Sequence, residues 1–330
     1  MRKRWWTVAR VLISLGLLVF VLLTIGVERI GRSLLQAEPG PLLVALGLYT
    51  LGVALRAVRW RALLLALNLR IPLRRLVYLY FAGSFFSAFL PTGFGGDVVR
   101  VLELSQEAQT AAVLGTVVLD RLTGLLVLFV MALLALPFTV ELLPPQVALT
   151  IAAVAGGGLI AGALLLQGSW LRRLGRWLPE PLALTGEGPL ARAYAAITAC
   201  GWRALGVALF ISAIFNTLLV LVNYLAALAV GMRVGLIYFL VFVPLLSLAL
   251  TLPISMGGLG VREGVAVVLF TQVGADKAHA VAFSLAVYAT SRVVGLFGGA
   301  LYLLHSLRRL RQPRVQEAPS PDANRADWLP

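Results

Sequence analysis

The sequence has little of what soluble domains and metal sites are built from. Of its 330 residues only 13% are charged, one is cysteine and two are histidine. A soluble domain usually carries about 25% charged residues, so this composition excludes an ordinary water-soluble fold. The single Cys200 excludes an internal disulfide, and His279 and His305 are too few for a histidine-built metal site. We therefore expect no metal and no cofactor.

Apolar residues are abundant instead, at 60% of the chain, with a mean hydropathy of +0.93. Six apolar runs reach the roughly 20 residues that a transmembrane helix needs. They are 8–27, 41–60, 112–137, 147–167, 204–230 and 280–304. An outer-membrane barrel is disfavoured, because its strands are only about 9–11 residues long and alternate in polarity. The first run has no small-residue cleavage site after it, so we interpret it as a retained span.

The net charge of +14 comes from basic residues that cluster at the ends of these apolar runs and do not form a soluble basic domain. Four groups of basic residues lie before the first span, after the second, in the loop at 168–203 and in the C-terminal tail. The positive-inside rule places all four in the cytoplasm, together with both termini. We therefore expect a multi-pass protein of the cytoplasmic (inner) membrane that contacts anionic lipid and not nucleic acid.

Two further hydrophobic regions, 76–108 and 236–274, are each interrupted by a proline and a glycine pair. The orientation requires the first region to enter and leave on the cytoplasmic side and the second to start and end outside. Both contain the pattern L-P-x3-G-G-x3-R, at Leu90–Arg100 and at Leu252–Arg262, offset by 162 residues. Paired broken segments in corresponding halves are typical of inverted-repeat transporters with a site near the midplane. The predicted fold is all-α, with about six full spans and two re-entrant helical hairpins that form an inverted repeat.

The repeated motif also predicts an anion site. Glycines allow close approach to the backbone, and a half-helix that starts at a hairpin tip directs free N–H groups inward. Arg100 and Arg262 add planar guanidinium groups that suit phosphate, and a buried arginine usually lines a cavity. The candidate substrate-binding residues are Gly95, Gly96, Asp97, Arg100, Arg121, Gly257, Gly258, Arg262, Glu263 and Arg292. The alternative is structural, with glycine breaks as helix kinks and the charges as internal ion pairs.

Three carboxylates in these segments are candidates for proton coupling, because burial raises a carboxyl pKa. They are Asp97, Asp120 and Glu263, with ion pairing as the competing role for Asp120. Two polar features have structural interpretations. Arg56, Arg59 and Arg61 around Trp60 are interpreted as an interfacial anchor, with substrate recruitment as the alternative. Asn216 and Asn223, seven residues apart, are candidates for interhelical hydrogen bonds, with packing as the favoured role.

At these motifs the chain resembles the flippase-like transmembrane domain of the lysylphosphatidylglycerol synthase family, which includes stand-alone YbhN-like and AglD-like proteins. The matching stretches are Leu90–Arg100, the pair Asp120-Arg121, Leu252–Gly264 with its PISMGGLGVREG, and Ser291–Tyr302. The resemblance implies a membrane domain that moves lipids or lipid-linked sugars between leaflets, without the aminoacyl-transferase domain of the larger members. We therefore expect a transporter rather than an enzyme.

The resulting hypothesis is a translocase of an anionic phospholipid or of a polyprenyl-phosphate-linked lipid. The membrane domain is expected to span residues 1–310, with a disordered cytoplasmic tail at 311–330. Two alternatives stay open. One is an integral-membrane transferase acting on a lipid-linked sugar or phospholipid, and the other is an accessory subunit of a cell-envelope pathway. Partners would then be membrane lipids, further copies of the chain or envelope-synthesis enzymes.

Overall fold

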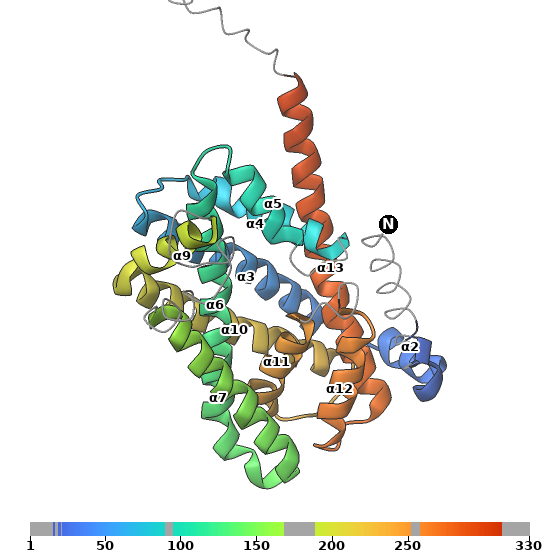
Figure 1. The fold of residues 1–330 in the computed structure, drawn as a ribbon. Helices are drawn as coiled ribbons and strands as arrows, with labels where there is room; N and C mark the ends of the chain where they lie inside the picture. The colour runs from blue at the N-terminus through green and yellow to red at the C-terminus, as the bar shows by residue number, and fades with distance from the viewer. Residues whose placement is uncertain are drawn as a thin grey trace, which may run out of the picture.

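The computed structural model describes residues 16, 19, 20, 22–89, 95–167, 189–251 and 258–311. Within these ranges the chain is helical and contains no strand (Figure 1). The elements are α2 (Val27–Leu35), α3 (Pro39–Ala66), α4 (Leu73–Phe89), α5 (Gly95–Leu104), α6 (Thr110–Ala135), the short 3-10 turns η1 (Leu136–Phe138) and η2 (Val140–Leu142), α7 (Pro145–Gln167), α9 (Pro189–Ala199), α10 (Gly201–Ala229), α11 (Leu236–Thr251), α12 (Val261–Thr271) and α13 (Lys277–Arg311).

Five helices are long and apolar enough to cross a membrane. They are Pro39–Ala66, Thr110–Phe138, Pro145–Gln167, Gly201–Ala229 and Lys277–Leu307. They coincide with five of the six predicted runs, which confirms a multi-pass α-helical membrane protein. Most of the run 8–27 and all of 312–330 lie outside the described residues. The predicted basic loop at 168–203 is in part helix α9, which begins at Pro189.

Helices α3 and α10 form the centre of the molecule and run antiparallel. The amide of Glu38, just before α3, donates to the carbonyl of Ala229 at the end of α10 at 2.9 Å. Midway, a Cβ added to Gly52 would lie 3.3 Å from the Phe215 ring, so glycine sets the close approach of the two helices. Helix α6 packs against this pair and against α9 and α11.

Helices α4 and α5 pack against each other, and the start of α4 lies beside the end of α5. Arg75 near the start of α4 lies 3.1 Å from Glu103 and 3.0 Å from Glu107, at and just beyond the end of α5. At the other end of the pair, the Gly96 amide donates to Ser87 Oγ at 3.0 Å. The predicted region 76–108 is therefore a pair of antiparallel helices, joined through residues 90–94 outside the described part.

Helices α11 and α12 repeat this arrangement. The rings of Phe239, near the start of α11, and Phe270, near the end of α12, lie 4.9 Å apart. At the other end, Gly258 packs against Leu250 with a φ of +82°, a backbone conformation that favours glycine. Residues 252–257, which join the two helices, lie outside the described part.

The long helix α13 contacts both pairs, one with each half. Its N-terminal half packs on α11 and α12, with the Phe283 ring 5.2 Å from the Phe270 ring. Its C-terminal half packs on α4, where the Tyr302 ring lies 5.1 Å from the Phe86 ring. The last turns of α13 project beyond the bundle (Figure 1). The two pairs therefore lie at different levels along one transmembrane helix.

Candidate functional site

A buried carboxylate, Asp120 of α6, joins the helices around the site. It has no exposed surface, and its Oδ1 accepts a hydrogen bond from Arg59 Nε at 2.6 Å. Its Oδ2 accepts from the Tyr80 hydroxyl and lies 3.5 Å from Arg100 Nη1. Arg59 also donates from Nη1 to Ser212 Oγ at 2.8 Å. One carboxylate thus connects α3, α4, α5 and α6, and through Arg59 also α10.

A second carboxylate, Asp97 of α5, bridges two arginines. Its Oδ1 pairs with Arg100 Nη2 and its Oδ2 with Arg121 Nε. The Arg100 guanidinium is only 2% exposed and lies 4.1 Å from the centre of the Tyr80 ring. Arg100 is therefore held in place from several sides by charge and by an aromatic face.

Asp97 borders a cavity of about 200 Å³ that we call the basic cavity. Five arginines from five different helices line it: Arg56, Arg100, Arg121, Arg262 and Arg292. Asp97 is the one carboxylate among the described lining residues. The inner ends of both helix pairs reach this cavity, through Gly96 and Asp97 on one side and through Gly258 and Arg262 on the other.

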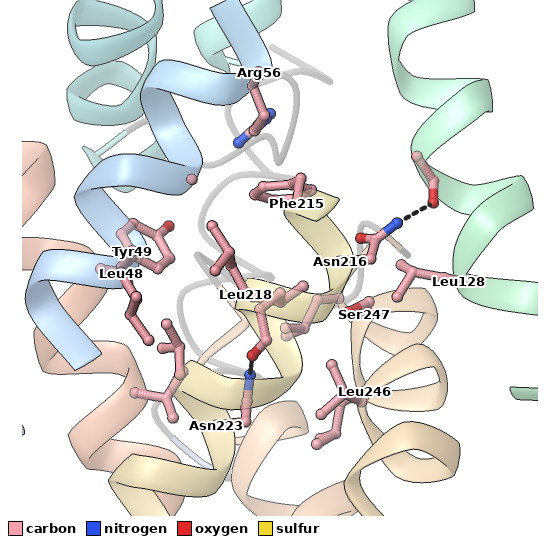
Figure 2. A pocket seen from close by; sticks show the side chains of 18 of the residues that line it. Leu48, Tyr49, Arg56, Leu128, Phe215, Asn216, Leu218, Asn223, Leu246 and Ser247 are labelled. Carbon is pink, nitrogen blue, oxygen red and sulfur yellow. Dashed lines mark hydrogen bonds between the residues drawn. The ribbon is translucent and has the colours of Figure 1, made fainter. Parts of the chain in front are cut away.

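An apolar cavity of about 320 Å³ adjoins it. Its walls are mostly aliphatic and aromatic side chains of α3, α6, α10, α11 and α13. Figure 2 shows Arg56 and Phe215 at one end of this cavity and Asn223 and Leu246 at the other. Six residues line both cavities: Tyr49, Arg56, Arg121, Leu250, Arg262 and Ser291. The two cavities are therefore neighbours, with arginines at the boundary between a charged and an apolar space.

Arg262 stands at this boundary with an unused donor. Its Nη1 is buried and has no hydrogen-bond partner among the described residues. The adjacent Glu263 accepts no hydrogen bond from it. Glu263 Oε2 accepts instead from the Gly260 amide at 2.6 Å, and Oε1 accepts from Ser284 Oγ at 3.2 Å. A buried donor without an acceptor costs about 1–3 kcal/mol, which a ligand oxygen would relieve.

Most of the residues singled out by the sequence meet at the basic cavity. Those that line it are Gly96, Asp97, Arg100, Arg121, Gly258, Arg262 and Arg292. Gly95, Asp120 and Glu263 are buried beside it and are not among its lining residues, and Gly257 lies outside the described part. The amide of Gly96 already donates to Ser87 Oγ, so the arginines rather than this amide present donors to the cavity.

The interfacial-anchor interpretation of the Arg56–Arg61 cluster is wrong for two of its members. Arg59 is 3% exposed and Trp60 is fully buried, and the Trp60 indole donates to Thr116 Oγ1 at 3.1 Å. Arg56 is not among the predicted substrate-binding residues, yet it lines both cavities. A signal was present, because Arg56 and Arg59 stand three apart inside an apolar run and so share one helix face.

The two asparagines behave differently from each other. Asn216 of α10 donates to the carbonyl of Gly124 in α6 at 3.0 Å, which confirms an interhelical bond. Asn223 donates at 2.8 Å to Leu219 of its own helix, so the interhelical alternative is wrong there. Both side chains line the apolar cavity and are among its few polar groups. In the part of the chain that the structure describes, no three His, Cys, Asp or Glu side chains are grouped as metal ligands.

Comparison with known proteins agrees with this architecture. Residues 7–299 match the family described as Lysylphosphatidylglycerol synthase TM region. The UPF0104 membrane protein PH1989 of Pyrococcus horikoshii is 26% identical over 129 residues, which cover 38% of this chain and 38% of that relative. The chain thus matches well under half of the length of this relative. The family match, by contrast, extends from before α2 into α13 and includes both helix pairs. The chain belongs to the Lysylphosphatidylglycerol synthase TM region family.

Proposed function

We propose that this protein moves an anionic lipid between the two leaflets of the cytoplasmic membrane. The observation that carries the proposal is the pair of adjoining cavities with shared arginines. A lipid has the same division, with a charged headgroup joined to an apolar chain. The headgroup would occupy the basic cavity and part of a chain the apolar cavity.

The basic cavity suits a phosphate group. Arg100, Arg121 and Arg262 present guanidinium groups from three helices, and guanidinium matches phosphate oxygens in a planar, bidentate geometry. Each arginine inside a membrane costs at least about 2.5–3.5 kcal/mol on insertion scales. An anionic headgroup would offset part of that cost while it is bound.

The helix pairs support a transport mechanism. We propose that α4–α5 and α11–α12 are re-entrant hairpins related as an inverted repeat. The Tyr78 ring near the start of α4 lies 4.7 Å from the His305 ring near the end of α13, whereas α12 contacts the opposite half of α13 through Phe270. Two pairs that start at opposite ends of a spanning helix and meet at one cavity would allow that cavity to open to either leaflet.

The transferase alternative has less support from the geometry. It needs a carboxylate free to act as a base beside the bound phosphate. Asp97 is bound by Arg100 and Arg121, and Glu263 is bound by the Gly260 amide and by Ser284. Movement of an intact lipid is therefore the better-supported function.

Translocation by purified protein in proteoliposomes tests the proposal. We would compare labelled phosphatidylglycerol, phosphatidylethanolamine and a short polyprenyl phosphate, using wild type, Arg262→Ala and the control Arg203→Ala. Arg203 is exposed near the start of α10 and lines neither cavity. We expect movement of an anionic lipid by wild type and the control, and at least about a tenfold lower rate for Arg262→Ala. Equal rates in all three proteins would contradict the proposal.

A further inference from the structure

We infer that the basic cavity selects headgroups whose charges are all negative, with Asp97 as an internal counter-anion that the headgroup competes with. This inference rests on the proposed function and specifies its substrate class. It separates phosphate lipids without a cation from aminoacylated lipids, whose headgroup carries an ammonium group.

A headgroup ammonium would need an acceptor, and the carboxylates near the cavity are engaged. Asp97 uses one oxygen for Arg100 and the other for Arg121. Asp120 is fully buried behind the lining residues, and Glu263 is bound to Gly260 and Ser284. The joining segments 90–94 and 252–257 contain no acidic residue. A cation in the basic cavity would therefore face arginines, with no free carboxylate among the described residues.

The balance of charge around the two cavities is positive. Six arginines line them: Arg56, Arg59, Arg100, Arg121, Arg262 and Arg292. Among the residues that the structure describes, three carboxylates lie at or next to these arginines: Asp97, Asp120 and Glu263. A net positive charge in a space of low dielectric attracts an anion and repels a cation much more strongly than it would in water. The same charges that favour a phosphate thus act against an aminoacylated headgroup.

Asp97 occupies the place that a phosphate would take. Its two oxygens receive one guanidinium each, as two oxygens of a phosphate would. Its side chain is 14% exposed, whereas that of Asp120 is fully buried. A phosphate offers more oxygens than a carboxylate, and Arg262 Nη1 is a buried donor without a partner among the described residues. An incoming phosphate can therefore replace Asp97 at the two arginines and satisfy Arg262 as well.

This arrangement orders lipid headgroups by charge. A phosphate monoester carries about −1.5 to −2 at pH 7, because its second pKa is about 6. A phosphate diester carries a single negative charge, and an aminoacylated diester adds a positive one. The expected order of affinity is monoester, then diester, then aminoacylated diester.

A binding series on the wild-type protein tests the order. The thermal unfolding midpoint in neutral detergent would be measured against dioctanoyl phosphatidic acid, dioctanoyl phosphatidylglycerol and its lysylated form. We expect the largest shift with phosphatidic acid, a smaller one with phosphatidylglycerol, and none with the lysylated lipid. A shift with the lysylated lipid equal to or above that of phosphatidylglycerol would overturn the inference and leave the proposed function intact. No shift with any of the three would count against the proposed function itself.

The direction in which one substitution changes the affinity for lipid tests the role of Asp97. Asp97→Asn removes the internal counter-anion, so phosphatidic acid should bind with roughly a tenfold lower Kd. The control is Glu103→Gln on the same helix, which neutralises a carboxylate at the far end of the α4–α5 pair, where it contacts Arg75. The control should bind as wild type does. Weaker or unchanged binding by a folded Asp97→Asn protein would overturn the inference, and the wild-type series decides it if that variant does not fold.

Discussion

At the scale of single residues, the buried ion pairs determine whether the site exists. Asp120 satisfies Arg59, Tyr80 and Arg100 from one position in α6. Burying these charges is costly, and such a pair need not stabilise the fold relative to apolar residues. It does make the fold depend on each partner, because the loss of one leaves the other charges uncompensated.

The substitution Asp120→Ala should therefore be severe. It leaves Arg59 and Arg100 buried without their shared carboxylate, a loss of about 3–5 kcal/mol by analogy with broken buried pairs. The measurement is the thermal unfolding midpoint in detergent together with the yield of monodisperse protein. Tyr80→Phe is the graded control, since it removes one hydrogen bond to a charged group, worth about 1.5–3 kcal/mol. If Asp120→Ala unfolds at the wild-type temperature, the network does not hold the site together.

The sequence identifies some of these residues and cannot identify others. Arg100 and Arg262 are found because the same motif occurs twice and each arginine lies in an apolar segment. The partner of Asp120 is not found, because Arg59 lies 61 positions away and only packing brings the two together. Arg121 directly follows Asp120 in the sequence, yet its guanidinium pairs with Asp97 of another helix. Ion pairing between helices is a property of the fold rather than of local sequence.

At the scale of helices, close backbone contact holds α4 against its neighbours. A Cβ added to Gly298 of α13 would lie 1.9 Å from the carbonyl oxygen of Phe81. A Cβ on Gly96 would lie 2.2 Å from the carbonyl oxygen of Gly83. Small residues allow this approach between membrane helices, where packing rather than the hydrophobic effect drives association.

The corresponding prediction concerns two glycines. Gly298→Ala should destabilise the protein by about 1–3 kcal/mol, because the methyl group would overlap backbone that cannot move independently. Gly264→Ala is the matched control in α12, where an added Cβ has no described atom within 4 Å apart from its chain neighbours and its own helix backbone. There the change should be neutral or slightly stabilising, since alanine favours a helix over glycine by about 0.5–1 kcal/mol. Equal unfolding temperatures for the two variants would show that α4 and α13 are not in backbone contact.

Helix boundaries could be predicted where hydropathy was high and not elsewhere. Five spans were located from run length, and both broken regions from their proline and glycine residues. The helices α2 and α9 were not predicted, because each is short and mixes polar with apolar residues. The antiparallel pairing of α4 with α5 followed only indirectly, from the charge pattern of the flanking loops.

For the whole molecule, the inverted repeat requires that the two helix pairs have opposite orientations in the membrane. The two helix pairs should enter from opposite faces, and exposed glutamines mark the ends of both: Gln106 follows α5 and Gln272 follows α12. Cysteines at these positions, placed singly in a Cys200→Ala background, form a matched pair. In wild type, burial raises the pKa of the Cys200 thiol to about 11, so this thiol should react slowly with maleimide at neutral pH.

In intact cells, a membrane-impermeant maleimide should label Gln272→Cys and leave Gln106→Cys unmodified. After the membrane is permeabilised, both should react. This outcome follows from the positive-inside rule, which places the basic ends of the spans in the cytoplasm. Labelling of both cysteines in intact cells, or of neither, would contradict opposed helix pairs and with them the inverted repeat.

Crosslinking can show directly whether a lipid binds inside the bundle. A phosphatidic acid with a photoreactive diazirine in its acyl chain would be crosslinked to the purified protein, and the modified peptides mapped by mass spectrometry. We expect adducts on the cavity-lining residues within 215–223 of α10 and 243–250 of α11, and their loss in Arg262→Ala or with excess unlabelled lipid. Adducts confined to outward-facing side chains such as Leu149 and Ile160, which are 71% and 64% exposed, would contradict a lipid-binding site inside the bundle.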